Sequence, residues 1–224
     1  MAIVCSDINL LFFCAAKAGS TSISNMLIKN YQGKWLPENH IWDEKKNQIL
    51  VDYKHSTFNH LIKYNLLSID QITNLHIVVN TRNPFDWVLS DYLFKLQCYD
   101  LYLSANAPDW IVARANILKQ TASISFDEYV DNKYNNKHSS VFAQYIDGIE
   151  KIEGLELDIV KIEKINDHFA TVMSKLGIKN CPHIGHENST HAKKQDYRNY
   201  YTKKSRLIIE KSFAQDIEML EYQF

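Results

Sequence analysis

Two polar loops and one histidine are the parts of this chain best suited to chemistry. The first loop, residues 15–22, has the sequence AAKAGSTS and follows the apolar run NLLFFC. Lys17 supplies a positive charge on a flexible side chain, and Gly19 permits close approach of the backbone to a ligand. The other loop residues add backbone N–H groups and hydroxyl donors: Ala18, Ser20, Thr21 and Ser22. A strand that enters such a loop and a helix that leaves it direct N–H groups at one point, which favours a phosphate.

The second loop, residues 82–92, has the sequence RNPFDWVLSDY and follows the β-branched run HIVVNT. Pro84 stands where the first turn of a helix accepts proline, with Asn83 as the N-cap. The guanidinium of Arg82 can then bind a phosphate with two hydrogen bonds. Ser90 lies off the apolar stripe of this helix, so its hydroxyl is not committed to the core. Taken alone, Arg82 is also consistent with a surface ion pair, and Ser90 with a hydrogen bond to its own helix backbone.

His55 is the candidate general base. It lies in the segment DYKHSTF and directly follows the predicted strand 48–53, so we expect it at the same edge of the sheet as Lys17 and Arg82. A histidine with a pKa near 6.5 can accept a proton from an attacking hydroxyl at neutral pH. Four other histidines compete for this role: His40, His60, His183 and His186.

Strands that alternate with helices position these residues. Four apolar or β-branched segments are predicted strands: residues 9–14, 48–53, 76–81 and 155–162. Helices are predicted after the first loop, around residues 57–64, from Pro84 onwards, and after the fourth strand up to a C-cap at Gly177. This order predicts one α/β domain over residues 1–224, in which helices flank a central parallel sheet and ligands bind at the carboxyl ends of the strands.

The remaining segments are predicted to be helical. Residues 99–148 have an irregular helical pattern, and we expect residues 99–140 to shape an acceptor pocket or to form core. One last helix is predicted to carry four apolar residues on one face: Ile209, Phe213, Ile217 and Leu220.

Composition excludes several classes of protein. The 25 Lys and Arg residues balance 26 Asp and Glu residues, so the chain has no overall basic field for nucleic acid or an anionic membrane. Six of the basic residues fall within residues 193–206, which indicates either a local anion site or a solvated face. The four cysteines have no metal-binding or CxxC spacing, which favours a reduced, cytoplasmic protein. The apolar segment of residues 9–16 is too short to span a membrane.

The first loop differs from the GxxxxGK[ST] loop of P-loop NTPases, because Lys17 precedes Gly19. The order Lys-x-Gly-Ser-Thr-Ser instead resembles the 5′-phosphosulfate loop of sulfotransferases that use 3′-phosphoadenosine-5′-phosphosulfate (PAPS), written PKxGSTS. Ala16 replaces the proline of that motif.

The second loop resembles the 3′-phosphate motif of the same family, RNPxxRxxSxY. Five residues match it: Arg82, Asn83, Pro84, Ser90 and Tyr92. Trp87 stands where many members carry Arg or Lys. Two phosphate motifs in the family's order indicate a nucleotide with phosphates at both its 3′ and 5′ ends.

The resemblance implies a three-layer, P-loop-like fold and transfer of a sulfuryl group from PAPS to an acceptor hydroxyl. The desulfated nucleotide (PAP) would be the product, and no metal would be needed. Lys17 and residues 18–22 would hold the 5′-phosphosulfate, Lys17 would also stabilise the leaving oxygen, and Arg82 with Ser90 would hold the 3′-phosphate. The segment with His55 resembles carbohydrate sulfotransferases of the heparan 2-O type, which implies that His55 is the base and that the acceptor is a carbohydrate or another small hydroxylated molecule.

Two further segments extend the resemblance. Residues 158–169 are similar to the family's fourth-strand segment, with Glu163 as its acidic residue. The tail from residue 188 is similar to the stretch that closes over the nucleotide. Four of its residues could reach the donor: Ser189, Thr190, Lys193 and Lys194.

Two other functions remain open from the sequence. A nucleotide or small-molecule kinase with an atypical phosphate loop would need a carboxylate for Mg²⁺, for which Asp86 and Glu163 are available. A sulfotransferase-like module that binds nucleotide without turnover would not need a general base. Retention of Lys17, Arg82 and a candidate base favours the enzyme.

Overall fold

The computed structural model describes residues 2–46, 48–104, 106–185 and 195–224. The contacts divide the chain into two compact units, which are Met1–Arg82 with Val141–Asn188 and Asn83–Ser140 with Ser189–Phe224. The first unit is α/β and contains the central sheet, whereas the described part of the second unit is helical. The single domain over residues 1–224 stays a prediction.

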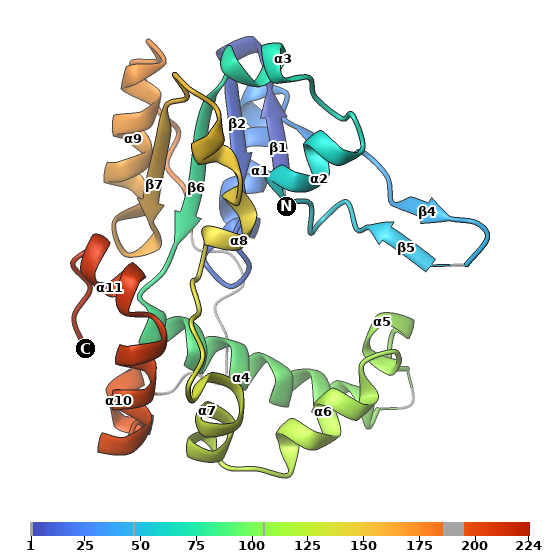
Figure 1. The fold of residues 1–224 in the computed structure, drawn as a ribbon, viewed down its shortest axis with the longest axis vertical. Coiled ribbons are helices and arrows are strands. Elements are labelled where there is room, and N and C mark those ends of the chain that lie inside the picture. Colours follow the sequence, from blue (N-terminus) through green and yellow to red (C-terminus); the bar gives the residue numbers. More distant parts are fainter. Residues whose placement is uncertain (1, 47, 105, 186–194) are drawn as a thin grey trace. The chain divides into compact units, whose positions relative to one another are not determined.

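A five-stranded sheet forms the centre of the first unit, in the order β3-β1-β2-β6-β7 (Figure 1). Its strands are β1 (Ala2–Cys5), β2 (Leu10–Phe13), β3 (Lys34–Leu36), β6 (His76–Thr81) and β7 (Leu157–Lys161). β2, β6 and β7 are parallel, and β1 runs antiparallel to both β2 and β3. The sheet is therefore mostly parallel, and the predicted α/β fold with a central sheet between helices is confirmed.

The predicted strand at residues 48–53 forms, but its place in the central sheet was predicted wrongly. β5 (Gln48–Val51) pairs antiparallel with β4 (Ile41–Asp43) in a separate two-stranded sheet. In β5 only Val51 is buried, whereas all six residues of β6 are buried. A central parallel strand is covered on both faces, and β5 is too exposed for that position.

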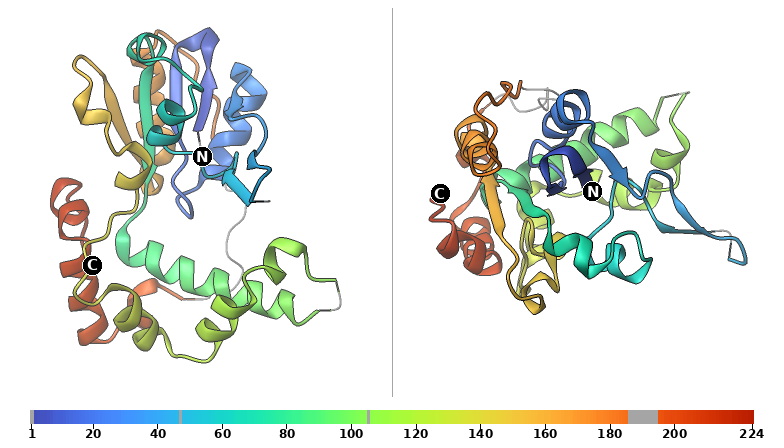
Figure 2. Two further views of the ribbon diagram at one scale, coloured as in Figure 1. Left: turned by 45° about the vertical axis from the view of Figure 1, so that its right-hand side comes forward. Right: turned by 90° about the horizontal axis from the view of Figure 1, so that it is seen from above.

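Helices cover both faces of the central sheet (Figure 2). α1 (Ser20–Tyr31) and α9 (Ile165–Lys175) share one core cluster with Phe12 and Val78. Phe13 points to the opposite face because side chains alternate along a strand, and its ring meets Phe58 of α2 (Phe58–Lys63) edge-on at 6.4 Å. The shorter elements of this unit are η1 (Ser6–Ile8), α3 (Ile69–Thr73), α8 (Ala143–Ile146), η2 (Ile149–Lys151) and η3 (Ile162–Lys164).

The second unit is built around α4 (Pro84–Tyr102). The predicted cap is confirmed, because the side-chain oxygen of Asn83 accepts a hydrogen bond from the N–H of Phe85 at 3.1 Å. The irregular helical region is confirmed as α5 (Asp109–Val112), α6 (Ala115–Ala122) and α7 (Phe126–Tyr134), followed by α8 in the first unit. None of the described helices is long and apolar enough to cross a membrane.

The predicted last helix is two helices, α10 (Lys203–Ser212) and α11 (Ala214–Met219), which follow η4 (Tyr197–Tyr200). Phe213 separates them with φ −108° and ψ 25°. Its ring is fully buried and packs against Trp87 and Tyr134. The apolar residues of this region therefore reach the core through a bend in the chain, and the prediction of one straight stripe was wrong.

Candidate functional site

The loop between β2 and α1 has an unusual backbone path. Lys17 has φ +61° and Gly19 has φ +77°, so both lie in the left-handed region. This region is uncommon for a residue with a side chain, and neighbouring contacts must therefore hold Lys17 in it. Gly19 is the N-cap residue of α1, and no side chain caps the helix there. The loop therefore leads directly into the helix N-terminus. This is the strand–loop–helix arrangement that the sequence predicts for a phosphate site.

Asn80 holds this loop at two points. Its side chain is fully buried near the end of β6. The amide oxygen accepts a hydrogen bond from the N–H of Ala15, and the amide nitrogen donates to the carbonyl of Ala18. Arg82 adds a third contact from the same strand end, because its Nη1 donates to the carbonyl of Lys17 at 2.9 Å. The two carbonyl oxygens that would repel a phosphate are thus bound by donors of the protein.

Ala16, which departs from the family's proline, has a defined role. Its N–H donates to the hydroxyl of Tyr145 in α8 at 3.1 Å. Proline has no N–H and could not make this hydrogen bond. The hydrogen bond to Tyr145 therefore holds the backbone at Ala16, the position where the family's motif has the rigid ring of proline.

Gly19 packs against the end of β7. A Cβ atom at this position would lie 2.3 Å from Cδ1 of Ile162. The positive φ favours glycine here, and a Cβ atom would require the end of the Ile162 side chain to move.

The loop and the residues next to it in the sequence carry no negative charge. Residues 14–24 contain no Asp or Glu. Burial raises the pKa of the Cys14 thiol to about 11, so this thiol is neutral at physiological pH. Ser20 and Ser22 are buried at the start of α1, and Thr21 is exposed. Lys17 is therefore the only formal charge within this stretch, which suits an anionic ligand.

Arg82 is the last residue of the first unit, and Ser90 lies on α4 of the second unit. Only 4% of Ser90 is exposed, and its hydroxyl oxygen has no hydrogen-bond partner among the described residues. The alternative that Ser90 bonds its own helix backbone is therefore not realised. A buried hydroxyl without a partner costs about 1–3 kcal/mol, and a phosphate oxygen would satisfy it. The hydroxyl oxygen of Thr81, the residue before Arg82, is also buried and has no hydrogen-bond partner among the described residues. The sequence did not lead us to predict a role for Thr81.

His55 is held at the edge of the sheet where β2 ends, although by a different route from the predicted one. The neighbouring Ser56 is fully buried, accepts a hydrogen bond from the N–H of Ala2 at 3.0 Å, and donates to the carbonyl of Leu36. Ala2 pairs with both Leu36 and Phe13, the last residue of β2. The predicted edge follows from these contacts with β1 and β3, because β5 lies outside the central sheet.

The His55 ring is accessible and has a carboxylate beside it. Its side chain is 51% exposed, and Nε2 lies 3.8 Å from Oδ2 of Asp52. The backbone N–H of His55 also donates to the carbonyl of Asp52 at 2.8 Å, which fixes the turn. The role of His55 as the base stays a prediction.

Among the competing histidines, His60 has other partners, whereas His40 shares Asp52 with His55. The ring of His60 completes the N-terminal capping box of α2 with Thr57, and burial and the charge of Lys63 lower its pKa. Nδ1 of His40 lies 3.5 Å from Oδ1 of Asp52, and the His40 ring meets the Tyr53 ring edge-on. His183 lies after α9 and is exposed. His186 and the tail residues Ser189, Thr190, Lys193 and Lys194 lie outside the described residues.

A family model described as the sulfotransferase family matches residues 1–223. The chain belongs to the sulfotransferase family. The match covers both units of this sulfotransferase and makes it a transferase of sulfuryl groups to an acceptor. Comparisons with curated proteins and with solved structures returned no match.

The hydrogen bonds that hold the loop between β2 and α1 in this sulfotransferase were not predicted from the sequence. Asn80 is a polar residue inside the buried run HIVVNT, and a buried amide needs hydrogen-bond partners. That signal could have identified Asn80, but not the loop it holds. Tyr145 and Ile162 gave no comparable signal. Glu163 is exposed on η3, directly after β7.

Proposed function

We propose that this sulfotransferase uses PAPS as its donor and transfers the sulfuryl group to a hydroxyl of a carbohydrate or another small hydroxylated molecule, releasing PAP. The observation that carries the proposal is the clamped loop between β2 and α1. Asn80 and Arg82 bind the carbonyls of Ala18 and Lys17, so the loop is set up to receive the 5′-phosphosulfate on its N–H side. Residues 18–22 would contribute these donors.

The 3′-phosphate is assigned to Arg82 and Ser90. Arg82 donates to the carbonyl of Lys17 through Nη1, and a planar guanidinium matches the geometry of a phosphate group. The buried hydroxyl of Ser90 fits an anionic oxygen as its missing acceptor. Both residues also match the motif of a 3′-phosphate site, which supports PAPS over a nucleotide with phosphates at the 5′ end alone.

In the proposed reaction the acceptor oxygen attacks sulfur, and the bond between sulfur and the bridging oxygen of PAPS breaks. His55 accepts the proton of the attacking hydroxyl, and Asp52 stabilises the imidazolium that forms, 3.8 Å away. Lys17 and the N-terminus of α1 stabilise the negative charge that develops on the bridging oxygen. His55→Ala should leave PAP binding within about twofold while turnover falls at least about 100-fold. Equal losses of both would assign His55 a structural role instead.

A reducing, cytoplasmic environment is part of the proposal. All four cysteines are present as thiols rather than in disulfides, and three of them are buried. Burial raises the pKa of the Cys5 thiol to about 12, assisted by the charge of Asp7, so this thiol does not ionise in the physiological range.

Calorimetric titration of the protein with PAP and with ATP plus Mg²⁺ tests the donor assignment. PAP should bind saturably, and Lys17→Ala and Ser90→Ala should each weaken its binding. ATP with Mg²⁺ should bind more weakly, because it has no 3′-phosphate. Saturable binding of ATP with Mg²⁺ and none of PAP would instead support the kinase.

A further inference from the structure

A cavity lies in the second unit, away in sequence from both donor motifs. Its volume is about 390 Å³. The C-terminal end of α7 and the segment after it form one wall, and α10 from Lys204 to Ser212 forms the other. The N–H of Ser139 donates to the carbonyl of Ser212 at 2.8 Å and ties the two walls together. The cavity is therefore part of the folded unit.

The lining is basic and contains no Asp or Glu. Lys137, His138, Lys204 and Lys211 all contribute to it. Lys204 is neutralised by Asp131, whose Oδ2 lies 2.8 Å from its Nζ. Lys137 donates only to the neutral carbonyl of Asn132, and Lys211 has no ion pair among the described residues. Two lysines without an ion pair among the described residues thus line one cavity in a chain whose net charge is −1.

Ser212 adds a buried polar group to the same cavity. Only 4% of the residue is exposed, and its hydroxyl oxygen has no hydrogen-bond partner among the described residues. Such a group is costly unless a ligand satisfies it. A hydroxyl beside two lysines is a suitable set of donors for an oxyanion.

One side of the cavity is apolar. Tyr134, Leu207 and Ile208 line it, and 45% of Leu207 is exposed. An inorganic ion would leave this surface in contact with water. The organic part of an ester would cover it and add the free energy of apolar burial.

We propose that this cavity binds a sulfate or phosphate monoester, with the charged group at Lys137, Lys211 and Ser212 and the organic group against Leu207 and Ile208. None of the lining residues belongs to the Lys17 loop or to the motif of Arg82 and Ser90. The inference therefore does not depend on PAPS being the donor.

The test is a calorimetric titration with phenyl sulfate, phenyl phosphate and inorganic sulfate at constant ionic strength, in saturating PAP. PAP keeps these probes out of the proposed donor site. Both phenyl esters should bind saturably, and at least about tenfold more tightly than inorganic sulfate because of the apolar wall. Preference between the two esters decides which headgroup the cavity takes.

Three variants locate the binding. Ser212→Ala should weaken phenyl ester binding about tenfold, because it removes a hydrogen bond to a charged group. Lys211→Gln should weaken it about three- to fivefold, as expected for one exposed charge. Lys203→Gln, on the same helix but outside the cavity, is the matched control and should change nothing.

Several results would overturn the proposal. The absence of saturable binding by either ester would do so, as would equal weakening by Lys203→Gln and Lys211→Gln, which would indicate diffuse attraction to surface charge. A melting temperature within about 2 °C of wild type shows that Ser212→Ala still folds. Lys17→Ala, titrated without PAP, should leave ester binding unchanged. If the wild-type protein binds the esters but shows no PAP binding at all, the donor assignment is refuted and this site stands.

Discussion

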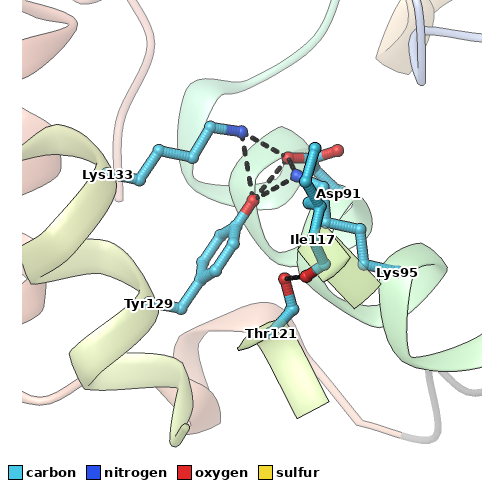
Figure 3. A network of polar contacts seen from close by, with 6 residues as sticks. All are labelled: Asp91, Lys95, Ile117, Thr121, Tyr129 and Lys133. Atoms are coloured by element: carbon cyan, nitrogen blue, oxygen red, sulfur yellow. Dashed lines mark hydrogen bonds and ion pairs between the residues drawn. The ribbon is translucent and has the colours of Figure 1, made fainter. Parts of the chain in front are cut away.

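The loop around Lys17 in the first unit and the charge cluster around Asp91 in the second unit use lysine in opposite ways. In the cluster, Oδ2 of Asp91 accepts hydrogen bonds from Lys95 at 2.6 Å, Lys133 at 2.7 Å and the Tyr129 hydroxyl at 2.5 Å (Figure 3). Each charged group there has an opposite charge as its partner. Residues 14–24, by contrast, contain Lys17 and no carboxylate.

The difference separates a structural cluster from a candidate site for ligands. The buried carboxylate has its charge satisfied within the protein, and each lysine of the cluster already donates to it, which leaves fewer donors for an anion. In the loop, hydrogen bonds from Asn80 and Arg82 go to the backbone carbonyls. Those contacts fix the shape of the loop without introducing a negative charge beside Lys17. A lysine in a rigid, acid-free loop is therefore a better candidate for binding an anion than a lysine in a compensated cluster.

The largest expected effect distinguishes Lys17 in the loop from Lys133 in the cluster. Lys17→Ala should lower turnover with PAPS about 10²–10³-fold, as expected for the loss of one preorganised donor at the leaving oxygen. Lys133→Met, in the cluster, should lower the free energy of unfolding by about 1–2 kcal/mol and leave turnover within about threefold. Steady-state kinetics and chemical denaturation of both variants make the comparison. Near-wild-type turnover in Lys17→Ala would contradict the mechanism.

The next prediction concerns the hydrogen bonds from Asn80 to the loop, and it compares Asn80 with His76 at the other end of β6. Asn80→Leu leaves two buried backbone groups of the loop without partners, so it should cost about 2–4 kcal/mol of stability and weaken PAP binding at least about tenfold. His76, at the other end of β6, lies between Glu156 and Asp158 at 3.0 and 2.7 Å.

His76→Gln is the matched control for that prediction. It should lower stability as well but leave PAP binding unchanged in titrations of the folded protein. Equal weakening of PAP binding in both variants would show that Asn80 acts only through general stability.

The Asp91 cluster should appear in the acid stability of the protein. Burial alone would raise the pKa of Asp91, but Lys133 and Lys95 outweigh it and lower this pKa to about 2. A carboxyl with a folded-state pKa below its unfolded value of 3.8 stabilises the protein above pH 4, and this stability is lost as the pH falls towards 2. The loss should amount to about 2 kcal/mol.

Denaturant unfolding of wild type and Asp91→Asn between pH 4.5 and about pH 2 measures this contribution. The wild-type curve should fall more steeply than that of the variant, by the amount that Asp91 contributes. Parallel curves would mean that the carboxyl is not stabilised by its two lysines.

The smallest effect concerns Ala16. Ala16→Pro and Tyr145→Phe each remove the hydrogen bond between the Ala16 N–H and the Tyr145 hydroxyl, so each should cost about 1 kcal/mol. Because both changes remove the same bond, the double variant should cost clearly less than the sum. Additive losses in thermal unfolding would show that the two residues act independently.

The elements predicted well from the sequence are those whose residues all share one environment, such as a strand that is buried along its whole length. β6 is buried at every position and follows a β-branched run, so its bounds at residues 76–81 were predicted correctly. Residues 48–53 were placed in the wrong sheet, because a short apolar run does not reveal whether neighbouring elements cover both of its faces. Phe213 looked like one more residue of an apolar stripe, and only packing against Trp87 and Tyr134 shows the bend there.

The candidate site was predicted unevenly for a related reason. Lys17, Gly19 and the hydroxyl residues lie together in one loop, so local sequence identifies them. The partners of that loop, Asn80 and Tyr145, lie 65 and 129 residues along the chain from the atoms they hold. Such contacts depend on the tertiary fold, and residue type alone cannot assign them.

Transfer of label from PAPS carrying ³⁵S on its sulfuryl group tests the central claim most directly. The purified protein is incubated with this donor and a panel of hydroxylated acceptors, beginning with oligosaccharides, and both labelled acceptor and PAP are quantified. The account predicts labelled acceptor and PAP in equal amounts, with both lost in Lys17→Ala and retained in Lys133→Met. PAP formation no faster than in the absence of protein with every acceptor, or equal activity in the two lysine variants, would contradict it.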